Sequence, residues 1–288
     1  MTDKNLKLDT YAKNTWCPGC GNFGILTALK QAIFSLIKQG TPKENIVVVS
    51  GIGCGSKIID YLNLNSFSAL HGRPVISGEG IKLGNPDLEV IVSVGDGGVY
   101  NEGIAHLIHA AKRNSDITVL VHDNRSFALT TSQFTATSPK GFKGRSTPFG
   151  NIEEPFNPLK LMLASKATFI ARGYSFKIEH LKNLIIKGVQ HKGFSFIEIL
   201  QPCVSFFDTT QFYNERVYEL EEDNLASEKE ALEKIKEWNY NTDKSRIPIG
   251  VFYEIQKPTY EEQLLKGLIP SKRERIINLD FLINLIKN

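Results

Sequence analysis

Three apolar runs constrain the fold of this chain more than any other feature of its sequence. They are Asn45–Ser50 (NIVVVS), Leu88–Val94 (LEVIVSV) and Ile117–His122 (ITVLVH). Runs that stay apolar at consecutive positions are typical of strands covered on both faces, as in parallel sheets. Helical patterns at Phe23–Lys38 and Glu102–Arg113 alternate with these runs. The sequence therefore predicts an α/β fold with a mostly parallel sheet and helices on both faces.

The alternation continues in the second half of the chain. We expect strands at Ala167–Ala171 and Phe194–Leu200, with a helix at Ile178–His191 between them. A loop rich in Ser, Thr, Gly and Pro spans Thr130–Pro158. Loops longer than about 12–15 residues in a compact domain usually carry function or are disordered.

The part of the chain after residue 205 follows a different pattern. Residues 219–245 are highly charged and predict a solvent-exposed helix, and Ile247–Ile255 (IPIGVFYEI) predicts a strand. We therefore divide the chain into a main domain, residues 1–205, and a C-terminal extension, residues 206–288. We expect the extension to pack on that domain or on another subunit.

Composition excludes several classes of protein. The chain is 41% hydrophobic and 23% charged, which is ordinary for a globular protein. Its net charge of +3 is too small to predict a nucleic-acid or acidic-membrane partner. No apolar run approaches the roughly 18 residues of a membrane span, and the polar start MTDKNLKLDT does not read as a signal peptide. We expect a cytoplasmic protein that binds neither nucleic acid nor membrane.

Glycine and polar residues follow two of the predicted strands. Gly95-Asp96-Gly97-Gly98 comes directly after Leu88–Val94, and Asp123-Asn124 follows Ile117–His122. One intervening helix makes the two strands plausible neighbours, and ligands gather beyond the carboxyl ends of such strands. A carboxylate and an amide oxygen suit Mg²⁺, and glycines let backbone N–H groups approach a diphosphate. Asp-Gly and Asp-Asn are also ordinary turn formers, so a structural role stays open.

A dinucleotide site is a poorer interpretation of these loops. Neither GIGCGS nor GDGGVY completes the G-x-G-x-x-G pattern of such a site.

The four cysteines all lie in loops rich in Gly or Pro. Cys17 and Cys20 form a C-P-G-C knuckle, Cys54 lies in GIGCG, and Cys203 follows Gln-Pro. Four cysteines in 288 residues do not make the disulfide framework of a small secreted scaffold. Structural zinc usually takes two paired knuckles, whereas an iron–sulfur cluster takes four thiolates at scattered spacing. The spacing favours a cluster and leaves zinc, or unreactive cysteines without metal, open.

Five motifs occur together and in order, and they resemble the β subunit of an archaeal-type 2-oxoacid:ferredoxin oxidoreductase. They are WCPGCGNFGIL, GIGCGSK, HGR, GDGG and the loop that begins with Asp-Asn. The resemblance covers roughly residues 14–205, and IPIGVFYE adds to it near the C-terminus. It implies the thiamine diphosphate-binding fold, with a domain of the diphosphate-binding type.

The same resemblance implies three cofactors, namely thiamine diphosphate, Mg²⁺ and one [4Fe–4S] cluster. Asp96, Asn124 and the backbone carbonyl of Ser126 would hold Mg²⁺, and the cluster would be ligated by Cys17, Cys20, Cys54 and Cys203. The positions that match contacts to thiamine diphosphate are Ile52, Gly53, Cys54, Gly55, His71, Gly97, Gly98, Ala128 and Leu129.

The activity implied is the oxidative decarboxylation of a 2-oxoacid with CoA to acyl-CoA and CO₂, with electrons passing through the cluster to ferredoxin. The chain has length for one diphosphate-type domain, so we expect an α subunit to supply the second half of the site, including the glutamate that activates the cofactor ring. Two alternatives are a non-redox thiamine diphosphate-dependent decarboxylase and a zinc-stabilised nucleotide-binding module.

Two cations are candidate substrate ligands. Lys57 lies three residues after Cys54, and we interpret it as a partner for a substrate carboxylate, which would favour dicarboxylic acids such as 2-oxoglutarate. The other interpretation is a lysine that tunes the cluster or faces solvent. Arg73 is a second candidate for anion binding, with a salt bridge as the alternative. We expect His106, His109 and His122 to pack or form hydrogen bonds rather than to catalyse.

Three positions depart from the patterns frequent in the family. Asn22 stands where Asp is frequent, Gly98 replaces the second Asp of GDGD, and Thr131-Ser132 replaces a pair such as Lys-Gly before Gln133. These departures bear on substrate preference more than on cofactor binding.

Overall fold

The computed structural model describes residues 7–221, 224–240 and 245–274, together with residues 279, 283, 284 and 286. Its strands are β1 (Ile46–Ser50), β2 (Asn65–Ser68), β3 (Glu89–Gly95), β4 (Thr118–Asp123), β5 (Phe169–Tyr174), β6 (Ser195–Leu200), β7 (Val217–Glu219) and β8 (Ile247–Glu254). Its α-helices are α1 (Asn22–Lys38), α2 (Pro74–Gly84), α3 (Ile104–Arg113), α4 (Pro158–Ala164), α5 (Ile178–Gln190), α6 (Thr210–Arg216), α7 (Glu228–Lys236) and α8 (Tyr260–Leu265).

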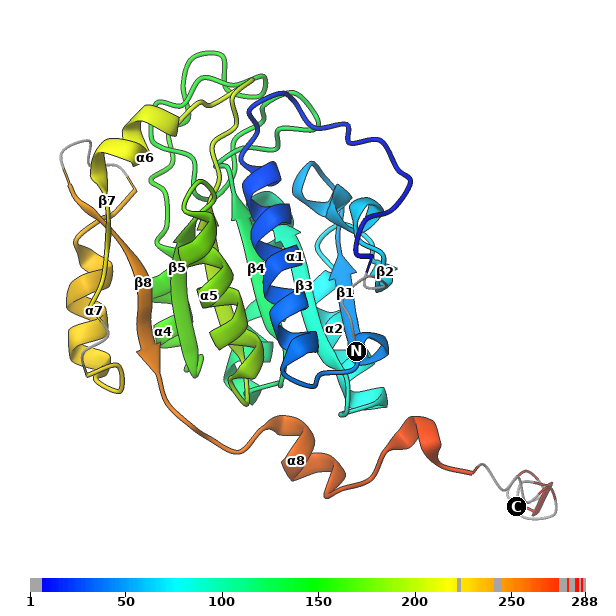
Figure 1. Ribbon diagram of the computed structural model, residues 1–288. Helices are drawn as coiled ribbons and strands as arrows, with labels where there is room; N and C mark the ends of the chain where they lie inside the picture. The colour runs from blue at the N-terminus through cyan, green and yellow to red at the C-terminus, as the bar shows by residue number, and fades with distance from the viewer. Residues whose placement is uncertain are drawn as a thin grey trace.

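The strands form one twisted sheet in the order β2-β1-β3-β4-β6-β5-β8-β7 (Figure 1). All of its pairings are parallel except the one between β5 and β8. The central strands β1, β4, β5 and β6 are buried at every position, because helices cover both faces of the sheet. The predicted α/β class is confirmed.

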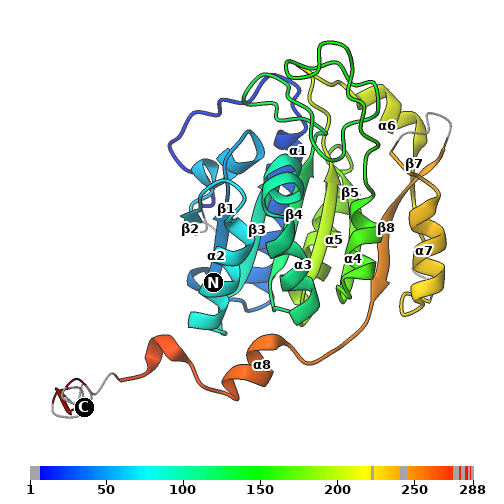
Figure 2. The same cartoon turned by 180° about the vertical axis from the view of Figure 1, so that it is seen from behind.

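Two apolar clusters lie on opposite faces of the sheet. Helices α1 and α5 pack against each other on one face, where Ile25, Leu29 and Leu184 join strand residues such as Val48. On the other face, seen in Figure 2, helices α2, α3, α4 and α7 cover the alternate strand residues. This alternation of side chains explains why consecutive apolar positions in one strand serve both layers.

The predicted strands and helices before residue 205 match the structure within one to three residues at most of their ends. The helix predicted at Glu102–Arg113 begins at Ile104, because a π-helical turn at Gly97–Glu102 precedes it. The edge strand β2 was not predicted, because its sequence NSFS is exposed throughout and lacks an apolar pattern. The long loop between β4 and α4 is present as predicted.

The charged stretch 219–245 is only partly the helix that its composition predicts. Helix α7 covers Glu228–Lys236, whereas Val217–Glu219 pairs with β8 as strand β7. Residues 222–223 and 241–244 of this stretch lie outside the described residues. Strands β7 and β8 extend the same sheet as the main domain, and the division at residue 205 stays a prediction.

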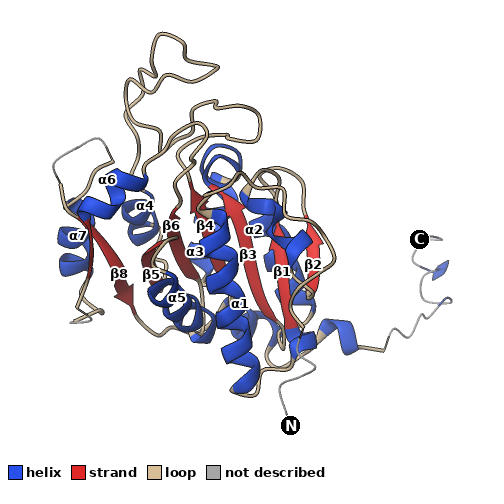
Figure 3. Ribbon diagram, turned by 45° about the horizontal axis from the view of Figure 1, so that its top comes forward, coloured by secondary structure: helices blue, strands red, loops and turns tan. Residues whose placement is uncertain are grey.

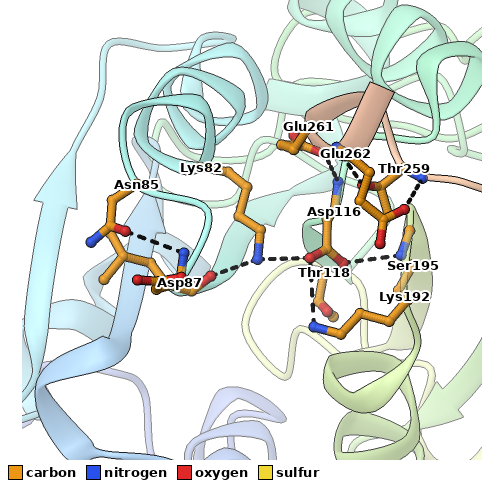
Figure 4. Close-up of polar contacts among 12 residues, drawn as sticks. Lys82, Asn85, Asp87, Asp116, Thr118, Lys192, Ser195, Thr259, Glu261 and Glu262 are labelled. Carbon is orange, nitrogen blue, oxygen red and sulfur yellow. Dashed lines mark hydrogen bonds and ion pairs between the residues drawn. The ribbon is translucent and has the colours of Figure 1, made fainter. Parts of the chain in front are cut away.

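After β8 the chain turns back beneath the amino ends of the strands (Figure 1). The backbone N–H of Asp116 donates to Glu261 Oε2 at 3.0 Å, and Asp116 Oδ2 pairs with buried Lys82 at 2.7 Å (Figure 4). Asn114 Nδ2 donates to the carbonyls of Lys257 and Pro258. These contacts attach the segment that carries α8 to the edge of the sheet opposite the glycine-rich loops.

No helix in the described part of the chain is long and apolar enough to cross a membrane.

One glycine fixes how closely α1 approaches the sheet. A Cβ atom at Gly24 would lie 1.9 Å from the backbone carbonyl oxygen of Ser175. We expect Gly24→Ala to lower the free energy of unfolding by about 3 kcal/mol, the upper end of overpacking costs, because the neighbour is backbone. The measurement is urea unfolding of the chain in its complex or alone, whichever is stable.

Gly80 in α2 is the matched control, because a Cβ atom there would meet nothing within 4 Å. Gly80→Ala should leave stability unchanged or raise it by about 0.5–1 kcal/mol, as alanine favours helix over glycine. Equal losses at both positions would contradict this account of the close approach.

Candidate functional site

The carboxyl ends of β1, β3 and β4 lie side by side. Ser50 is in register with Ser93, and Gly95 with His122, so the residues that follow these strands emerge at one edge of the sheet. Figure 3 shows loops extending from this edge. The predicted proximity of Asp96 and Asn124 follows from this register.

A cavity of about 80 Å³ opens at this edge, and we call it the glycine cavity. It is lined by Ile52, Gly53, Cys54, Gly55, His71, Gly95, Asp96, Gly97, Gly98, His122, Asn124, Ser126, Phe127, Ala128, Leu129 and Thr130. All nine positions predicted to contact thiamine diphosphate are in this lining, and so are the three predicted to hold Mg²⁺. The structure thus brings these residues together, while their roles stay predictions.

Asp96 is 2% exposed and is held by hydroxyl groups of the long loop. Thr135 Oγ1 donates to Asp96 Oδ2 at 2.6 Å, and Thr137 Oγ1 lies 3.4 Å from the same oxygen. Burial raises the pKa of Asp96 to about 7, although these hydroxyl groups act in the opposite direction. A buried carboxylate of this kind has its charge uncompensated unless a cation binds.

Asp123 is a second buried carboxylate next to Asp96. Its Oδ1 accepts from Thr137 Oγ1 at 2.8 Å and from the backbone N–H of Arg125 at 3.0 Å, whereas its Oδ2 is buried without a hydrogen-bond partner among the described residues. Burial, and then the charge of Asp96, raise the pKa of Asp123 well above its usual value. The pair of carboxylates fits a divalent cation, which would offset both charges.

The glycines leave free space on the cavity side. A Cβ atom at Gly53 or Gly95 would meet nothing within 4 Å, and Gly53 has a φ of +118°, a conformation that favours glycine. A Cβ atom at Gly97 would instead lie 2.3 Å from the Phe127 ring. The missing side chains at Gly53 and Gly95 therefore leave room beside the backbone of the cavity wall, which is what the close approach of a diphosphate requires.

His122 lines the glycine cavity and belongs to a buried chain of hydrogen bonds. Its Nε2 is 2.9 Å from Ser93 Oγ, and its Nδ1 is 2.7 Å from Asn22 Oδ1. Burial lowers the pKa of His122 to about 3, so the ring is neutral. The hydrogen-bonding role expected for His122 is thus observed, and it depends on Asn22, one of the positions that depart from the family pattern.

A second cavity, of about 210 Å³, adjoins the first, and we call it the cysteine cavity. It is lined by Thr15, Trp16, Cys17, Cys20, Cys54, Lys57, Asn124, Ala128, Leu129, Thr131, Gln201, Cys203, Val204, Ser205 and Phe206. All four cysteines are in this lining. Cys54, Asn124, Ala128 and Leu129 line both cavities, so the two share a wall.

The four cysteines form no disulfide, and two of them have a polar side chain next to the sulfur. Gln201 Nε2 lies 3.5 Å from Cys20 Sγ, and Ser205 Oγ lies 3.1 Å from Cys17 Sγ. Burial raises the pKa of the Cys20 thiol to about 11, and the other three cysteines act in the same direction. Within the part of the chain that is described, no three His, Cys, Asp or Glu side chains lie close enough to hold a metal ion as they stand.

This donor set fits an iron–sulfur cluster, because four thiols around one cavity offer the thiolate ligands that such a cluster uses. Because its pKa is raised, the Cys20 thiol stays protonated and unreactive in the free chain. A coordinating metal would ionise it.

The two candidate cations lie in different places. Lys57 is half-buried in the cysteine cavity, where its Nζ is 3.2 Å from Thr15 Oγ1 and its charge acts to lower the pKa of Cys54, which burial raises. Arg73 is exposed and lines neither cavity; its Nη1 is 2.8 Å from His106 Nε2. The structure therefore supports a charge near the cysteines at Lys57 and does not bring Arg73 into the site.

Several site residues were not predicted from the sequence. Thr135, Thr137 and Arg125 hold Asp96 and Asp123, and Phe127 lines the glycine cavity. Only the length and the Ser/Thr content of the loop gave any signal, because nothing in its sequence marks which hydroxyl group meets a carboxylate.

Two models of known protein families match this chain, one before and one after residue 200. A family model described as "Thiamine pyrophosphate enzyme, C-terminal TPP binding domain" matches residues 51–199. A second family model, which describes the C-terminal part of the pyruvate ferredoxin oxidoreductase β chain, matches residues 203–267.

Full-length relatives agree with these matches. The chain is 43% identical over 264 residues to 2-oxoacid:ferredoxin oxidoreductase 1, subunit beta, of Aeropyrum pernix, a match that covers 86% of this chain and 80% of that one. It is 34% identical to 2-oxoglutarate synthase subunit KorB of Methanocaldococcus jannaschii, over 90% and 94% of the two chains.

A solved structure shares the fold over nearly the whole length. It is 2-oxoglutarate:ferredoxin oxidoreductase from Magnetococcus marinus with 2-oxoglutarate, coenzyme A and succinyl-CoA bound. The TM-score is 0.88 at 30% identity, and the match covers 99% of this chain and 97% of that one. The five motifs, the shared sheet and these relatives lead to one conclusion: the chain belongs to the β subunits of the 2-oxoacid:ferredoxin oxidoreductases.

Proposed function

We propose that this chain, with an α subunit, converts a 2-oxoacid and CoA to acyl-CoA and CO₂ and passes the electrons to ferredoxin. The observation that carries the proposal is the pair of adjoining cavities. One is lined by every residue expected to bind thiamine diphosphate and Mg²⁺, the other by all four cysteines, and Cys54 lines both. A non-redox decarboxylase would have no use for that second cavity, and the relatives do not favour it.

Asp96, Asn124 and the carbonyl of Ser126 are the proposed Mg²⁺ ligands, and Gly97 and Gly98 the proposed diphosphate contacts. Oxygen ligands at the ends of two neighbouring strands suit a hard cation that bridges to a diphosphate. The loop hydroxyls of Thr135 and Thr137 orient the Asp96 carboxylate. The bound cation would offset the charge of both buried carboxylates.

The four cysteines are the proposed ligands of one [4Fe–4S] cluster. When bound, thiamine diphosphate supplies the carbanion chemistry at the substrate keto carbon, and the cluster accepts single electrons. Ala128 and Leu129 line both cavities, so they would lie between the two groups. A cytoplasmic location is part of the proposal, because thiols that ligate iron need a reducing compartment.

The α subunit is proposed to complete the site. This chain offers a diphosphate-type domain, and Ile52 and Leu129 at the mouth of the glycine cavity are 47% and 46% exposed. Exposed apolar side chains at a cavity mouth are suited to be covered by a partner. Ferredoxin, a 2-oxoacid and CoA are the further partners implied by the names of the relatives.

The decisive experiment is co-expression with the α subunit, followed by anaerobic purification and assay of viologen reduction. Reduction that requires both a 2-oxoacid and CoA is the expected result. A brown complex whose visible absorbance is bleached by dithionite is expected as well. No reduction with any common 2-oxoacid, or a colourless protein that contains zinc, would contradict the proposal.

Lys57 is proposed to favour dicarboxylic substrates by pairing with the distal carboxylate. Hydrogen bonds to charged groups are worth about 1.5–3 kcal/mol, so Lys57→Ala should lower kcat/KM for 2-oxoglutarate by roughly 10- to 100-fold. The value for pyruvate should change far less, since pyruvate has no distal carboxylate. Steady-state kinetics of the αβ complex with both substrates measures the difference.

Lys57→Arg is the control, because it keeps the charge and should retain the preference. Equal losses with both substrates would instead indicate that Lys57 tunes the cysteine cavity, where its charge already acts on the Cys54 thiol.

A further inference from the structure

Arg125 stands between two proposed Mg²⁺ ligands but does not face them. Arg125 lies between Asn124 and Ser126 in the sequence and is 3% exposed. It lines neither the glycine cavity nor the cysteine cavity. Its φ of +60° is in the left-handed region, which residues other than glycine seldom adopt. The surrounding contacts must therefore hold this residue in place.

The contacts of Arg125 run away from the cavity. Its Nε donates to the carbonyl of Thr137 at 2.7 Å, and its Nη2 donates to the carbonyl of Tyr240 at 2.6 Å. Its own backbone N–H donates to Asp123 Oδ1, and its carbonyl accepts from Ser138 Oγ at 2.6 Å. Both ends of the residue are thus attached to the loop that holds Asp96.

Aromatic rings from the C-terminal part of the chain surround the guanidinium group. Its Cζ lies 5.6 Å from the ring of Phe207, 5.7 Å from that of Trp238 and 5.6 Å from that of Tyr240. Cation–π contacts of this kind strengthen when they are desolvated. Residues after position 205 therefore contact Arg125, between the proposed Mg²⁺ ligands Asn124 and Ser126, through its side chain.

The guanidinium group of Arg125 lines neither cavity, so it cannot contact a ligand in the glycine cavity. It can still determine where Asn124 and Ser126 point, because it fixes the backbone between them. We propose that Arg125 is a positioning residue, through which Phe207, Trp238 and Tyr240 hold the loop in the geometry that binds Mg²⁺ and thiamine diphosphate. This inference rests on the proposed function of the glycine cavity.

Arg172 provides a matched control in the same core. It is fully buried, pairs with Glu198 at 2.7 Å and lies 5.0 Å from the Trp238 ring and 5.5 Å from that of Tyr240. Its side chain donates to Glu198, to the Tyr240 hydroxyl and to the carbonyl of Pro248, and so away from residues 124–126. A lysine at either position keeps the charge but removes the planar group that binds two acceptors and stacks on rings.

The test compares Arg125→Lys with Arg172→Lys in the αβ complex. Two quantities are measured in both, the thermal midpoint without cofactor and the Mg²⁺ concentration that half-saturates binding of thiamine diphosphate. We expect both variants to lower the thermal midpoint, and Arg125→Lys alone to raise the Mg²⁺ requirement by about 10- to 100-fold, the usual effect of losing a group that orients a metal ligand. Excess Mg²⁺ should restore binding in that variant.

Equal Mg²⁺ requirements in the two variants would overturn the inference, whether both shift or neither does. If Arg125→Lys does not assemble, Phe207→Leu, which removes a ring that contacts Arg125 and not Arg172, should shift the Mg²⁺ requirement in the same direction by a smaller factor. An unshifted requirement there would overturn it equally. A wild-type complex that binds no thiamine diphosphate with Mg²⁺ would defeat the proposed function itself.

Discussion

Asp96→Asn is expected to abolish Mg²⁺-dependent binding of thiamine diphosphate while leaving the chain folded. Loss of a group that merely orients a metal ligand already costs about 10- to 100-fold in metal affinity, so loss of the proposed ligand charge should cost at least that. The activity of the αβ complex should fall by the same factor or more. Calorimetric titration of thiamine diphosphate at several Mg²⁺ concentrations measures the affinity directly.

The cofactor-free stability of this variant separates a lost ligand from a lost fold. Asp96 and Asp123 are neighbouring buried carboxylates, and an amide at Asp96 removes their repulsion. The thermal midpoint without cofactor should therefore stay the same or rise, as is common for residues kept for function. Asp87→Asn, an exposed carboxylate that pairs with Lys272, is the control and should bind the cofactor normally. Unchanged binding in Asp96→Asn would contradict the proposed ligand set.

Cys54→Ser is expected to remove both the cluster and viologen reduction. Serine offers no thiolate, and Cys54 lines both cavities, so its loss affects the cluster at the wall shared with the cofactor. We expect the iron content and the visible absorbance to fall to background and activity to fall at least ~100-fold. Binding of thiamine diphosphate should weaken far less, because Cys54 is one of nine predicted contacts and the proposed diphosphate contacts at Gly97 and Gly98 are unchanged.

Ser205→Ala is the matched control for the cluster. It removes the hydroxyl group near Cys17 Sγ but no proposed iron ligand, so the complex should keep its iron. The same loss of iron is expected for serine at Cys17, Cys20 and Cys203. Full iron content in any one of these four variants would show that the cluster has a different ligand set.

The fold before residue 205 could be predicted because its signal is local. The run NIVVVS has no polar position between its first and last residues, and a strand of that kind is stable only between two layers of helices. Strand β2 gave no such signal, since NSFS pairs through its backbone along β1 while its side chains stay exposed. The antiparallel direction of β8 also could not be predicted, because pairing direction is not encoded in the apolar pattern of one strand.

The grouping of the candidate residues was predictable where a residue type alone limits the chemistry. Four cysteines in glycine- and proline-rich loops, and Asp96 between glycines, predict metal and phosphate chemistry, and the structure gathers these residues around two adjoining cavities while their roles stay predictions. The hydroxyl group of Thr135 could not be foreseen in the same way, because it is one of many in a long loop and lies 39 residues from Asp96 in sequence. Arg73 shows the converse, since its charge made it a candidate for anion binding and the structure leaves it exposed, next to His106.

The sequence by itself determined the class of fold, the four thiols and the carboxylate and amide at the ends of two strands. Only the tertiary structure decided that Cys17 and Cys203 line one cavity, that Asp123 lies beside Asp96, and that Arg125 donates to the backbone carbonyl of Thr137. The physical reason is that the functional group of a side chain is fixed by its residue type. Its burial, the charged groups near it and its hydrogen-bond partners instead depend on distant parts of the chain. Asp87 and Asp96 are the same residue type, yet one is exposed and the other is buried with its pKa raised to about 7.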